Sequence, residues 1–250
     1  MSITLKTKNL KVDFGSLHAL GPVNVQIQAG QFVSIVGPSG CGKSTLIRVF
    51  AGLQKPTSGE AWLGDTQIQQ PSSQIGMMFQ SANLMPWRTV TDNIALPLEL
   101  AGVQVEERQA AVRALLPHLK LEEFANAYPD ALSGGMAQRV ALGRVLIQQP
   151  DVLLLDEPFG ALDAMTREQI SLDLLTMRDH QTTVMVTHDI NEAVLLSDRV
   201  LVMSARPGQI MADIPVNLSR PRHIEQTYDA EFAYLAKTIR KALPHISKIS

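Results

Sequence analysis

The segment that most constrains this chain is a glycine-rich loop, Gly37-Pro38-Ser39-Gly40-Cys41-Gly42-Lys43-Ser44, which fits the pattern G-x-x-x-x-G-K-[S/T] in full. A strand-like apolar run over residues 31–36 precedes the loop, and a helical pattern over residues 43–53 follows it. Glycines let the backbone wrap closely, so that N–H groups point into the loop, and the helix start adds partial positive charge. The sequence therefore predicts a site for the phosphates of a nucleotide.

Each polar residue of this loop has an expected part in holding the nucleotide. Lys43 would reach the β- and γ-phosphates, the Ser44 hydroxyl would ligate Mg²⁺, and Thr45 would touch the α-phosphate. Cys41 is interpreted as a small filler rather than as a nucleophile. It is the single cysteine of the chain, which excludes an internal disulfide framework and a multi-cysteine metal site.

A second motif is an apolar strand that ends in two adjacent carboxylates. Residues 152–155 form a continuous apolar run, as expected for a strand buried on both faces of a parallel sheet, and Asp156 and Glu157 follow it. Period-two alternation predicts that the two side chains point to opposite sides. Asp156 would then face Mg²⁺ and Glu157 a water that attacks the γ-phosphate. The structural alternative is a capping or turn pair.

Short apolar runs and helical patterns alternate along the rest of the chain. Strands are predicted at residues 3–5, 23–27, 60–63, 75–79, 183–187 and 199–203, and helices at residues 165–178 and 190–196. This repeated strand–helix order predicts an α/β fold with a mainly parallel sheet. A terminal helix is expected within residues 224–243, docked by a stripe of apolar residues: Tyr228, Phe232, Leu235 and Ile239.

Residues 90–131 break this alternation and are predicted to form an inserted helical subdomain. Thr91 or Asp92 is the expected N-cap, and Pro97 is expected to kink or break the first helix. Over residues 105–119 one face is apolar, and it carries Val105, Val112, Leu115, Leu116 and Leu119.

Composition and charge limit the classes of function. The 250 residues are 45% hydrophobic and 18% charged, which predicts one large globular domain. Lys plus Arg number 22 and Asp plus Glu 24, a net charge of −2 that argues against nucleic acid as a partner. The start has no positive segment followed by an apolar stretch, and Pro22 and Asn24 interrupt the longest charge-free stretch, residues 14–42. We therefore expect a soluble, cytoplasmic chain.

A third motif narrows the choice among nucleotide-binding proteins. Leu132-Ser133-Gly134-Gly135-Met136-Ala137-Gln138-Arg139 stands directly before a helical run over residues 140–149. Ser133 can cap that helix, and Gly134 and Gly135 leave its N–H groups open to an anion. The phosphate loop already provides one phosphate site per chain. The helix start at Ser133 is a second candidate anion site, which suggests that it binds the ATP of another protomer.

With these motifs the sequence resembles the nucleotide-binding subunits of ABC transporters over residues 3–215. The resemblance implies a phosphate-loop NTPase core with a mainly parallel sheet, an antiparallel β subdomain and an inserted helical subdomain, in a single ABC ATPase domain over residues 1–250 with ATP and Mg²⁺ as ligands. Two departures are Met136, where many members carry Gln, and Gly160, where serine is frequent. Neither removes a catalytic group, so an active ATPase is expected.

Four more positions take a role from this resemblance. Gln80 would link the metal site to the helical subdomain, and His188 would be the switch histidine that contacts the γ-phosphate. Gly160-Ala161-Leu162-Asp163 would cross between protomers, and Phe14 would stack on adenine. Each has a structural alternative, because Phe14 could belong to the core and His188 could be a capping histidine.

The resemblance also implies an assembly. Two chains, as a homodimer or with a related cassette, would sandwich two ATP molecules between the phosphate loop of one and Ser133 and Gly135 of the other. Separate transmembrane permease subunits and an extracytoplasmic substrate-binding protein would complete it, with this chain peripheral on the cytoplasmic face of the inner membrane. A groove beside Gln80 would receive a short permease helix, unless the residues expected to line it, Leu84, Met85, Pro86 and Trp87, fold inward.

Several of these segments, together with Ser204-Ala-Arg-Pro-Gly208, are similar to one bacterial importer branch, which handles nitrate, sulfonates, taurine and similar small compounds. The alternatives are an exporter subunit with the same ATPase and a soluble ABC ATPase acting on ribosomes or DNA. The single phosphate loop, the absence of a heptad run and the lack of basic excess disfavour the soluble class. A phosphotransferase is disfavoured because residues 132–139 would then have no purpose.

Overall fold

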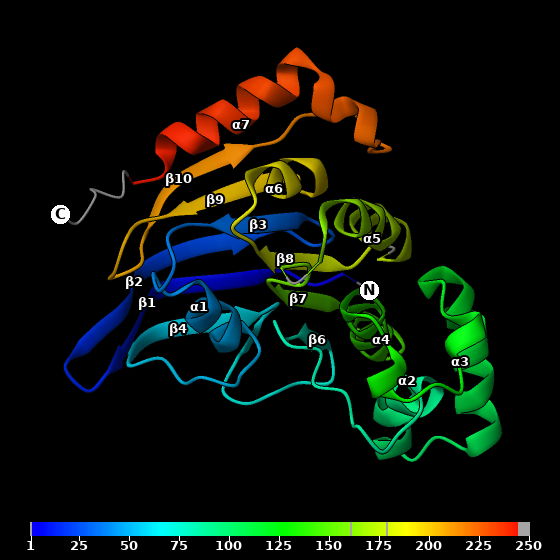
Figure 1. The fold of residues 1–250 in the computed structure, drawn as a ribbon. Coiled ribbons are helices and arrows are strands. Elements are labelled where there is room, and N and C mark those ends of the chain that lie inside the picture. The colour runs from blue at the N-terminus through cyan, green and yellow to red at the C-terminus, as the bar shows by residue number, and fades with distance from the viewer. Residues whose placement is uncertain (1, 161, 179, 245–250) are drawn as a thin grey trace.

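A computed structural model describes residues 2–160, 162–178 and 180–244 of the chain. In it two β-sheets form the centre of the fold (Figure 1). The first sheet is antiparallel in the order β2-β1-β4-β5, and the second has the order β10-β9-β3-β8-β7-β6. In the second sheet all neighbouring strands are parallel except β10, which pairs antiparallel with β9. The strands are β1 (Leu5–Phe14), β2 (Leu17–Ile27), β3 (Phe32–Val36), β4 (Ser58–Leu63), β5 (Thr66–Gln67), β6 (Ile75–Met78), β7 (Val152–Asp156), β8 (Thr182–Val186), β9 (Arg199–Met203) and β10 (Ile210–Pro215). The mainly parallel α/β core is confirmed.

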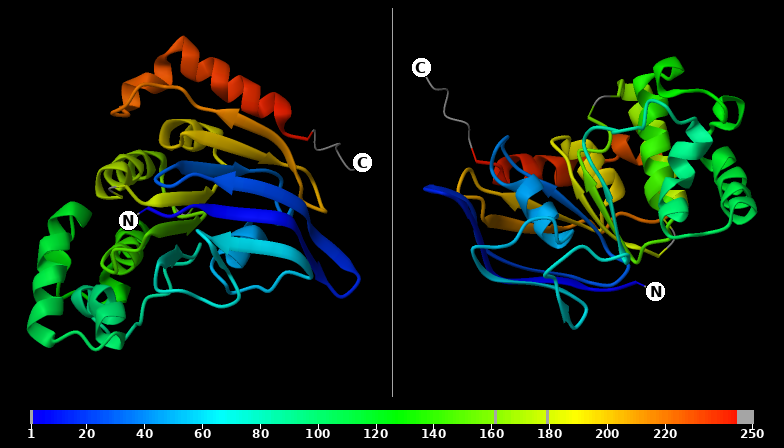
Figure 2. Two further views of the ribbon diagram at one scale, coloured as in Figure 1. Left: turned by 180° about the vertical axis from the view of Figure 1, so that it is seen from behind. Right: turned by 90° about the horizontal axis from the view of Figure 1, so that it is seen from below.

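Helices cover both faces of the parallel sheet (Figure 2). The helix α1 (Lys43–Phe50) lies between the two sheets, where it contacts β7 and β8 on one side and β4 and β2 on the other. The opposite face packs against α4 (Gly134–Leu146), α5 (Ala164–Met177) and α6 (Ile190–Leu196). Because both faces are covered, every residue of β3, β7 and β8 is buried, which explains the continuous apolar run of β7 and the mostly apolar β3 and β8.

The helices α2 (Val90–Leu100) and α3 (Val105–Leu119) pack with α4 around a small core of their own. The expected N-cap of α2 is wrong. The N-cap is Thr89, whose side chain accepts the N–H of Asp92, and not Thr91 or Asp92. Of the two effects expected of Pro97, a break does not occur, because Pro97 lies inside α2 and the chain turns instead at Gly102, where φ is +77°, while a kink stays a prediction.

The predicted apolar face of α3 is only partly buried. Val112, Leu116 and Leu119 enter the core and Leu115 packs against it, whereas Val105, in the first turn, is exposed. The described residues also form short 3₁₀ helices, η1 (Glu122–Phe124) and η2 (Pro129–Ala131) in this region and η3 (Ile224–Tyr228) before the C-terminal helix.

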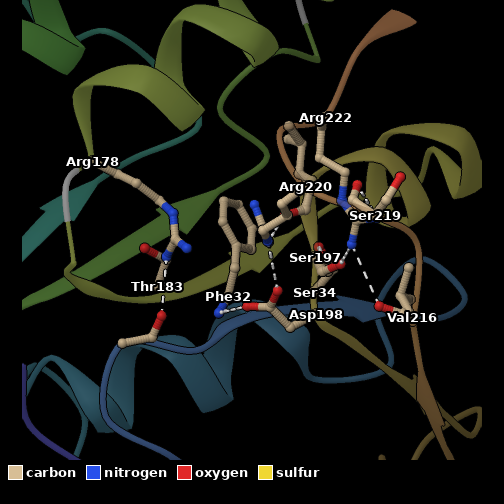
Figure 3. A network of polar contacts seen from close by, with 12 residues as sticks. Phe32, Ser34, Arg178, Thr183, Ser197, Asp198, Val216, Ser219, Arg220 and Arg222 are labelled. Carbon is tan, nitrogen blue, oxygen red and sulfur yellow. Dashed lines mark hydrogen bonds and ion pairs between the residues drawn. The ribbon is translucent and has the colours of Figure 1, made fainter. Parts of the chain in front are cut away.

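The C-terminal segment is held to the core by α7 (Ala230–Ala242) and by a cluster of polar contacts (Figure 3). Phe232, Leu235 and Ile239 are buried against α6, β9 and β10, as the stripe predicted. Tyr228 does not belong to the stripe, because it ends η3 and is 87% exposed. Figure 3 shows Arg222, from the stretch before η3, among carbonyl oxygens, with its guanidinium bonded to Ser197 O at 3.1 Å and Val216 O at 3.4 Å.

The predicted strands differ from the observed ones at β1, β2, β5 and β10, since β2 begins at Leu17 and β5 was not predicted, and some helix ends are shifted. β1 extends to Phe14, far beyond the predicted residues 3–5, because register irregularities and a left-handed Asn9 (φ 49°) interrupt its alternation. β10 had no prediction, since only every second residue of this edge strand is even partly buried. The predicted helix at residues 43–53 ends earlier, at Phe50, and α4 begins six residues before the predicted run, at Gly134.

Candidate active site

The phosphate loop connects the end of β3 to the start of α1, as predicted. Its backbone needs glycine at Gly42, where φ is +106° and an added Cβ would stand 2.8 Å from the carbonyl oxygen of Ala19. The Lys43 side chain folds over the loop and donates from Nζ to the carbonyl oxygens of Gly37 (2.8 Å) and Pro38 (2.9 Å). A phosphate group is a stronger acceptor than these neutral carbonyls, so the ammonium group is positioned to move onto a bound anion.

Next to the loop the structure brings together two of the predicted Mg²⁺ ligands. Ser44 Oγ donates to Oδ1 of Asp156, the last residue of β7, at 2.8 Å. Burial raises the pKa of the Asp156 carboxyl, and the Ser44 hydrogen bond opposes that rise. A hydroxyl and a carboxylate oxygen beside a phosphate loop are the donors that Mg²⁺ takes in company with substrate phosphates, so this pair fits that ion.

Glu157 stands at the centre of a second cluster. Its Oε2 accepts from Gln80 Nε2 at 3.1 Å and lies 3.6 Å from His188 Nδ1. Glu157 comes one residue after β7 and has φ 48°, so strand alternation does not set its direction and that part of the sequence reasoning is wrong. Asp156 and Glu157 nevertheless have separate partners, and their separate roles stay a prediction.

His188 occupies the turn between β8 and α6. Asp189 caps α6 by accepting the N–H groups of Asn191 and Glu192, so the backbone leaves the sheet at His188 and presents its ring to Glu157. Glu192 lies in the first turn of α6 and accepts a hydrogen bond from Thr187. Burial raises the pKa of Glu192 to about 7. Sequence reasoning did not single out Glu192, since nothing in the pattern distinguishes it from an exposed helix residue.

The expected crossing loop follows Glu157. An added Cβ on Gly160 would lie 3.8 Å from both Glu157 Oε2 and His188 Cε1, so this loop runs directly past the cluster. Asp163 caps α5 by accepting the N–H of Thr166 at 3.0 Å. Ala161 lies outside the described residues.

A cavity of about 320 Å³ joins the phosphate loop to the β1–β2 hairpin. It is apolar at Phe14, Leu17 and Ala19 and cationic at Lys43, and Glu157 also lines it. The other lining residues are Ser39, Gly40, Gly42, Ser44, Thr45 and Arg206. Phe14 is 49% exposed, which contradicts the core alternative. An apolar end beside a phosphate loop suits a base and its phosphates.

Ser133 and Gly135 do not line this cavity. Ser133 caps α4 as expected, with Oγ accepting the N–H of Met136 at 3.3 Å. An added Cβ on Gly135 would meet Thr166 Cγ2 of α5 at 3.0 Å. The same helix carries Gln138, which donates to the backbone carbonyl of Gln80 at 3.0 Å and so ties α4 to the Glu157 cluster.

The segment after Gln80 forms one wall of an apolar groove of about 410 Å³. Met85 lines this groove together with Phe79, Pro97 and Leu100, while Arg144 of α4 holds the segment by its carbonyl oxygens at Ala82 (2.6 Å) and Asn83 (2.9 Å). Of the four predicted lining residues, Leu84 instead packs against the core, and Trp87 is 72% exposed. Neither Pro86 nor Trp87 lines the groove.

Comparisons with known proteins agree with this geometry. A family model described as "ABC transporter" matches residues 20–160. The aliphatic sulfonates import ATP-binding protein SsuB of Bacillus thuringiensis is 44% identical over 89% of this chain and 88% of its own length. An uncharacterised ABC transporter ATP-binding protein of Methanocaldococcus jannaschii is 43% identical over 89% of this chain and 85% of its own.

Solved structures extend the similarity to three dimensions. A dimeric ATP-binding cassette in a post-hydrolysis state with ADP and Pi superposes with a TM-score of 0.77 at 35% identity, over 86% of this chain and all of the other. Membership of one family thus explains the phosphate loop, the carboxylates at the end of β7 and the overall fold. The chain belongs to the ABC transporter family, in which it is an ATP-binding subunit that hydrolyses ATP.

Proposed function

We propose that this chain is the ATP-hydrolysing subunit of an importer that takes up a small anion or organic solute such as nitrate, a sulfonate or taurine. The observation that carries the proposal is the 44% identity to an ATP-binding protein named for aliphatic sulfonate import, which extends over 89% of this chain. Energy for uptake comes from closure of a dimer of cassettes, because ATP binds the closed state better than the open one.

In this proposal the cavity holds ATP with adenine stacked on Phe14 and the phosphates on the backbone N–H groups of residues 37–45. Lys43 transfers its hydrogen bonds from the loop carbonyls to the β- and γ-phosphates. Ser44, Asp156 and Gln80 would hold Mg²⁺, which when bound would neutralise charge on the phosphate oxygens. The contact between Ser44 and Asp156 at 2.8 Å supports this ligand set.

Glu157 acts as the general base in the same scheme. Its carboxylate takes the proton of the attacking water, and His188 contacts the γ-phosphate on the other side. The 3.6 Å between His188 Nδ1 and Glu157 Oε2 supports a shared task. Gln80 donates to the same carboxylate oxygen at 3.1 Å, so it can orient Glu157 before ATP arrives.

Two chains assemble head to tail around two ATP molecules. Ser133 and Gly135 do not line the cavity of their own chain, which supports a role on the nucleotide of the partner. The partner is a second copy or a related cassette. The solved relative with ADP and Pi is itself dimeric.

A separate permease docks in the groove beside Gln80. Met85, Leu100 and Pro97 offer an apolar surface to a short helix, and Gln138 and Arg144 link that surface to the Glu157 cluster. Among the described residues no helix has the length and apolar character needed to cross a bilayer. The chain would therefore attach peripherally to the cytoplasmic face of the inner membrane, opposite an extracytoplasmic substrate-binding protein.

Pull-down of the tagged chain from detergent-solubilised native membranes, with mass spectrometry of its partners, tests this proposal. We expect a multi-span permease and, encoded with it, a binding protein that can be screened with taurine, alkanesulfonates and nitrate. Met85→Asp should lose the permease, whereas the matched control Met211→Asp, on the exposed edge strand β10, should retain it. A permease without any binding protein would contradict import, and ribosomal or DNA-repair partners would contradict transport.

A further inference from the structure

The turn between β9 and β10 lies against the phosphate loop. Arg206, in this turn, donates from Nε (3.1 Å) and Nη2 (3.0 Å) to the carbonyl oxygen of Gly40. Two residues further on, the backbone passes so close that an added Cβ on Gly208 would stand 2.0 Å from the carbonyl oxygen of Cys41. The turn therefore touches two successive residues of the loop, and neither contact follows from the phosphate-loop motif itself.

The same turn is hydrogen-bonded to β2, the second strand of the β1–β2 hairpin. Gly208 donates to Ala19 O at 3.2 Å and accepts from Gly21 N at 2.8 Å, which places the turn beside β2 (Figure 1). Gln209 Nε2 adds a bond to Gly21 O at 3.3 Å. One short turn thus connects the two walls of the cavity, the hairpin on one side and the phosphate loop on the other.

We propose that Arg206 is a positioning residue for ATP, which fixes the peptide between Gly40 and Cys41 and so holds the phosphate loop in the conformation that receives the phosphates. The inference rests on the proposed nucleotide site. The Gly40 carbonyl and the Cys41 N–H belong to one planar trans peptide and point in opposite directions. Fixing the oxygen to Arg206 therefore fixes the N–H, which here points back across the loop toward Pro38 O at 3.4 Å.

The chemistry of the side chain suits this task. A guanidinium group presents donors in a planar fork, so that both Nε and Nη2 reach one carbonyl oxygen. Gly40 has φ +71°, a conformation in which a glycine peptide can rotate at little cost without such an anchor. Arg206 also lines the cavity itself, so that its positive charge faces the space where the nucleotide would lie. Among the described residues it forms no ion pair that would neutralise this charge.

The test is the affinity and turnover of the full-length chain with a fluorescent N-methylanthraniloyl derivative of ATP in the presence of Mg²⁺. Arg206→Ala should weaken binding about tenfold, with kcat at saturating ATP changed by less than about threefold. Arg206→Lys, which keeps one donor and the charge, should recover part of the affinity. Arg113→Ala, on the exposed side of α3, is the matched control and should bind as the unaltered chain does.

Each other outcome has a defined meaning. If Lys43→Ala loses binding while Arg206→Ala binds within about twofold of the unaltered chain, Arg206 has no positioning role and the nucleotide site stands. If Lys43→Ala binds normally, the proposed site itself is wrong. If Arg206→Ala lowers kcat and the melting temperature without nucleotide, and Arg206→Lys is no better, the residue is only structural and the inference fails.

Discussion

Glu157 illustrates how the chemistry of single residues depends on their neighbours. It lies just beyond β7 with a left-handed backbone, and its carboxylate has Gln80 and His188 as partners. In the proposed mechanism Glu157 is the base, held by an amide and an imidazole, and the neighbouring Asp156 would serve the metal. Such a division of work between two adjacent carboxylates would follow from where the strand ends.

Glu157→Gln should retain ATP binding and slow hydrolysis by about 10²–10³-fold, because the amide cannot take a proton from the attacking water. The variant should also accumulate as an ATP-bound dimer. Phosphate release and size-exclusion chromatography with ATP measure the two effects. Glu106→Gln, on the exposed first turn of α3, serves as control, and near-normal turnover of Glu157→Gln would exclude it as the base.

Glu192 should make stability depend on pH. Burial raises the pKa of the Glu192 carboxyl from 4.5 to about 7. The charges of Asp189 and Glu157 add to this rise, and that of Arg167 opposes it. Between these two pH values the folded chain holds a proton that the unfolded chain has released. The free energy of unfolding should therefore fall by up to about 3 kcal/mol as pH rises from 4.5 to 7, and then level off.

The variant Glu192→Gln lacks this titration. The difference in unfolding free energy between it and the unaltered chain should grow in its favour over the same pH window, as measured by urea denaturation at 25 °C. A difference that stays constant from pH 5 to pH 8 would show that the Glu192 carboxyl titrates normally.

The sequence predicts the surroundings of some single residues but not of others. Lys43, Ser44 and Asp156 could be predicted because their spacing within motifs fixes their surroundings. Arg206 could not, because its contact with Gly40 joins positions 166 residues apart. Residues 204–208 are similar to one importer branch, but no local pattern predicts which loop they will contact.

At the scale of elements, patterns succeed where burial is complete. β3, β7 and β8 are covered on both faces and are mostly apolar, whereas β10 is an edge strand whose burial is partial at every second residue. The N-cap of α2 lies two residues before Thr91 and three before Asp92, the predicted caps, because Thr89, Thr91 and Asp92 are all good capping residues and only tertiary contacts choose among them.

The attachment of the C-terminal segment can be tested at this scale. Arg222 is 6% exposed, and burial lowers its pKa to about 10, so it stays charged at neutral pH among the carbonyl oxygens that it satisfies. Arg222→Met should leave those carbonyls unpaired and destabilise the chain by about 2–3 kcal/mol. Hydrogen exchange of α7 should accelerate, since the stretch that leads to it loses its anchor.

Arg220→Met is the matched control in the same segment. Arg220 pairs with Asp198 at 2.6 Å, but both side chains are about one-third exposed (37% and 32%). Water screens such a pair, so its loss should cost less than about 1 kcal/mol. Equal destabilisation by the two variants in urea denaturation would show that the buried guanidinium is not the anchor.

At the scale of the whole molecule, the position of Ser133 and Gly135 supports the proposal that two chains share each ATP molecule. One chain places its phosphate loop and its Ser133 segment on different elements, and only the loop lines the cavity. Two chains related head to tail would complete two sites, each with parts of both chains. Hydrolysis would then need the dimer even though every catalytic carboxylate belongs to one chain.

Complementation between two inactive variants tests this sharing. Lys43→Ala removes the loop lysine and Ser133→Ala removes the group that would face the ATP of the partner. In a mixed dimer one site combines both defects and the other has neither. A one-to-one mixture should therefore recover about a quarter of the normal ATPase rate, because half of the dimers are mixed and half of their sites are intact.

Ser133→Ala alone should leave ATP affinity of the monomer nearly unchanged, although loss of the α4 cap should cost about 1 kcal/mol of stability. If both motifs served the nucleotide of their own chain, every site in the mixture would carry one defect, and its rate would not exceed that of the separate variants.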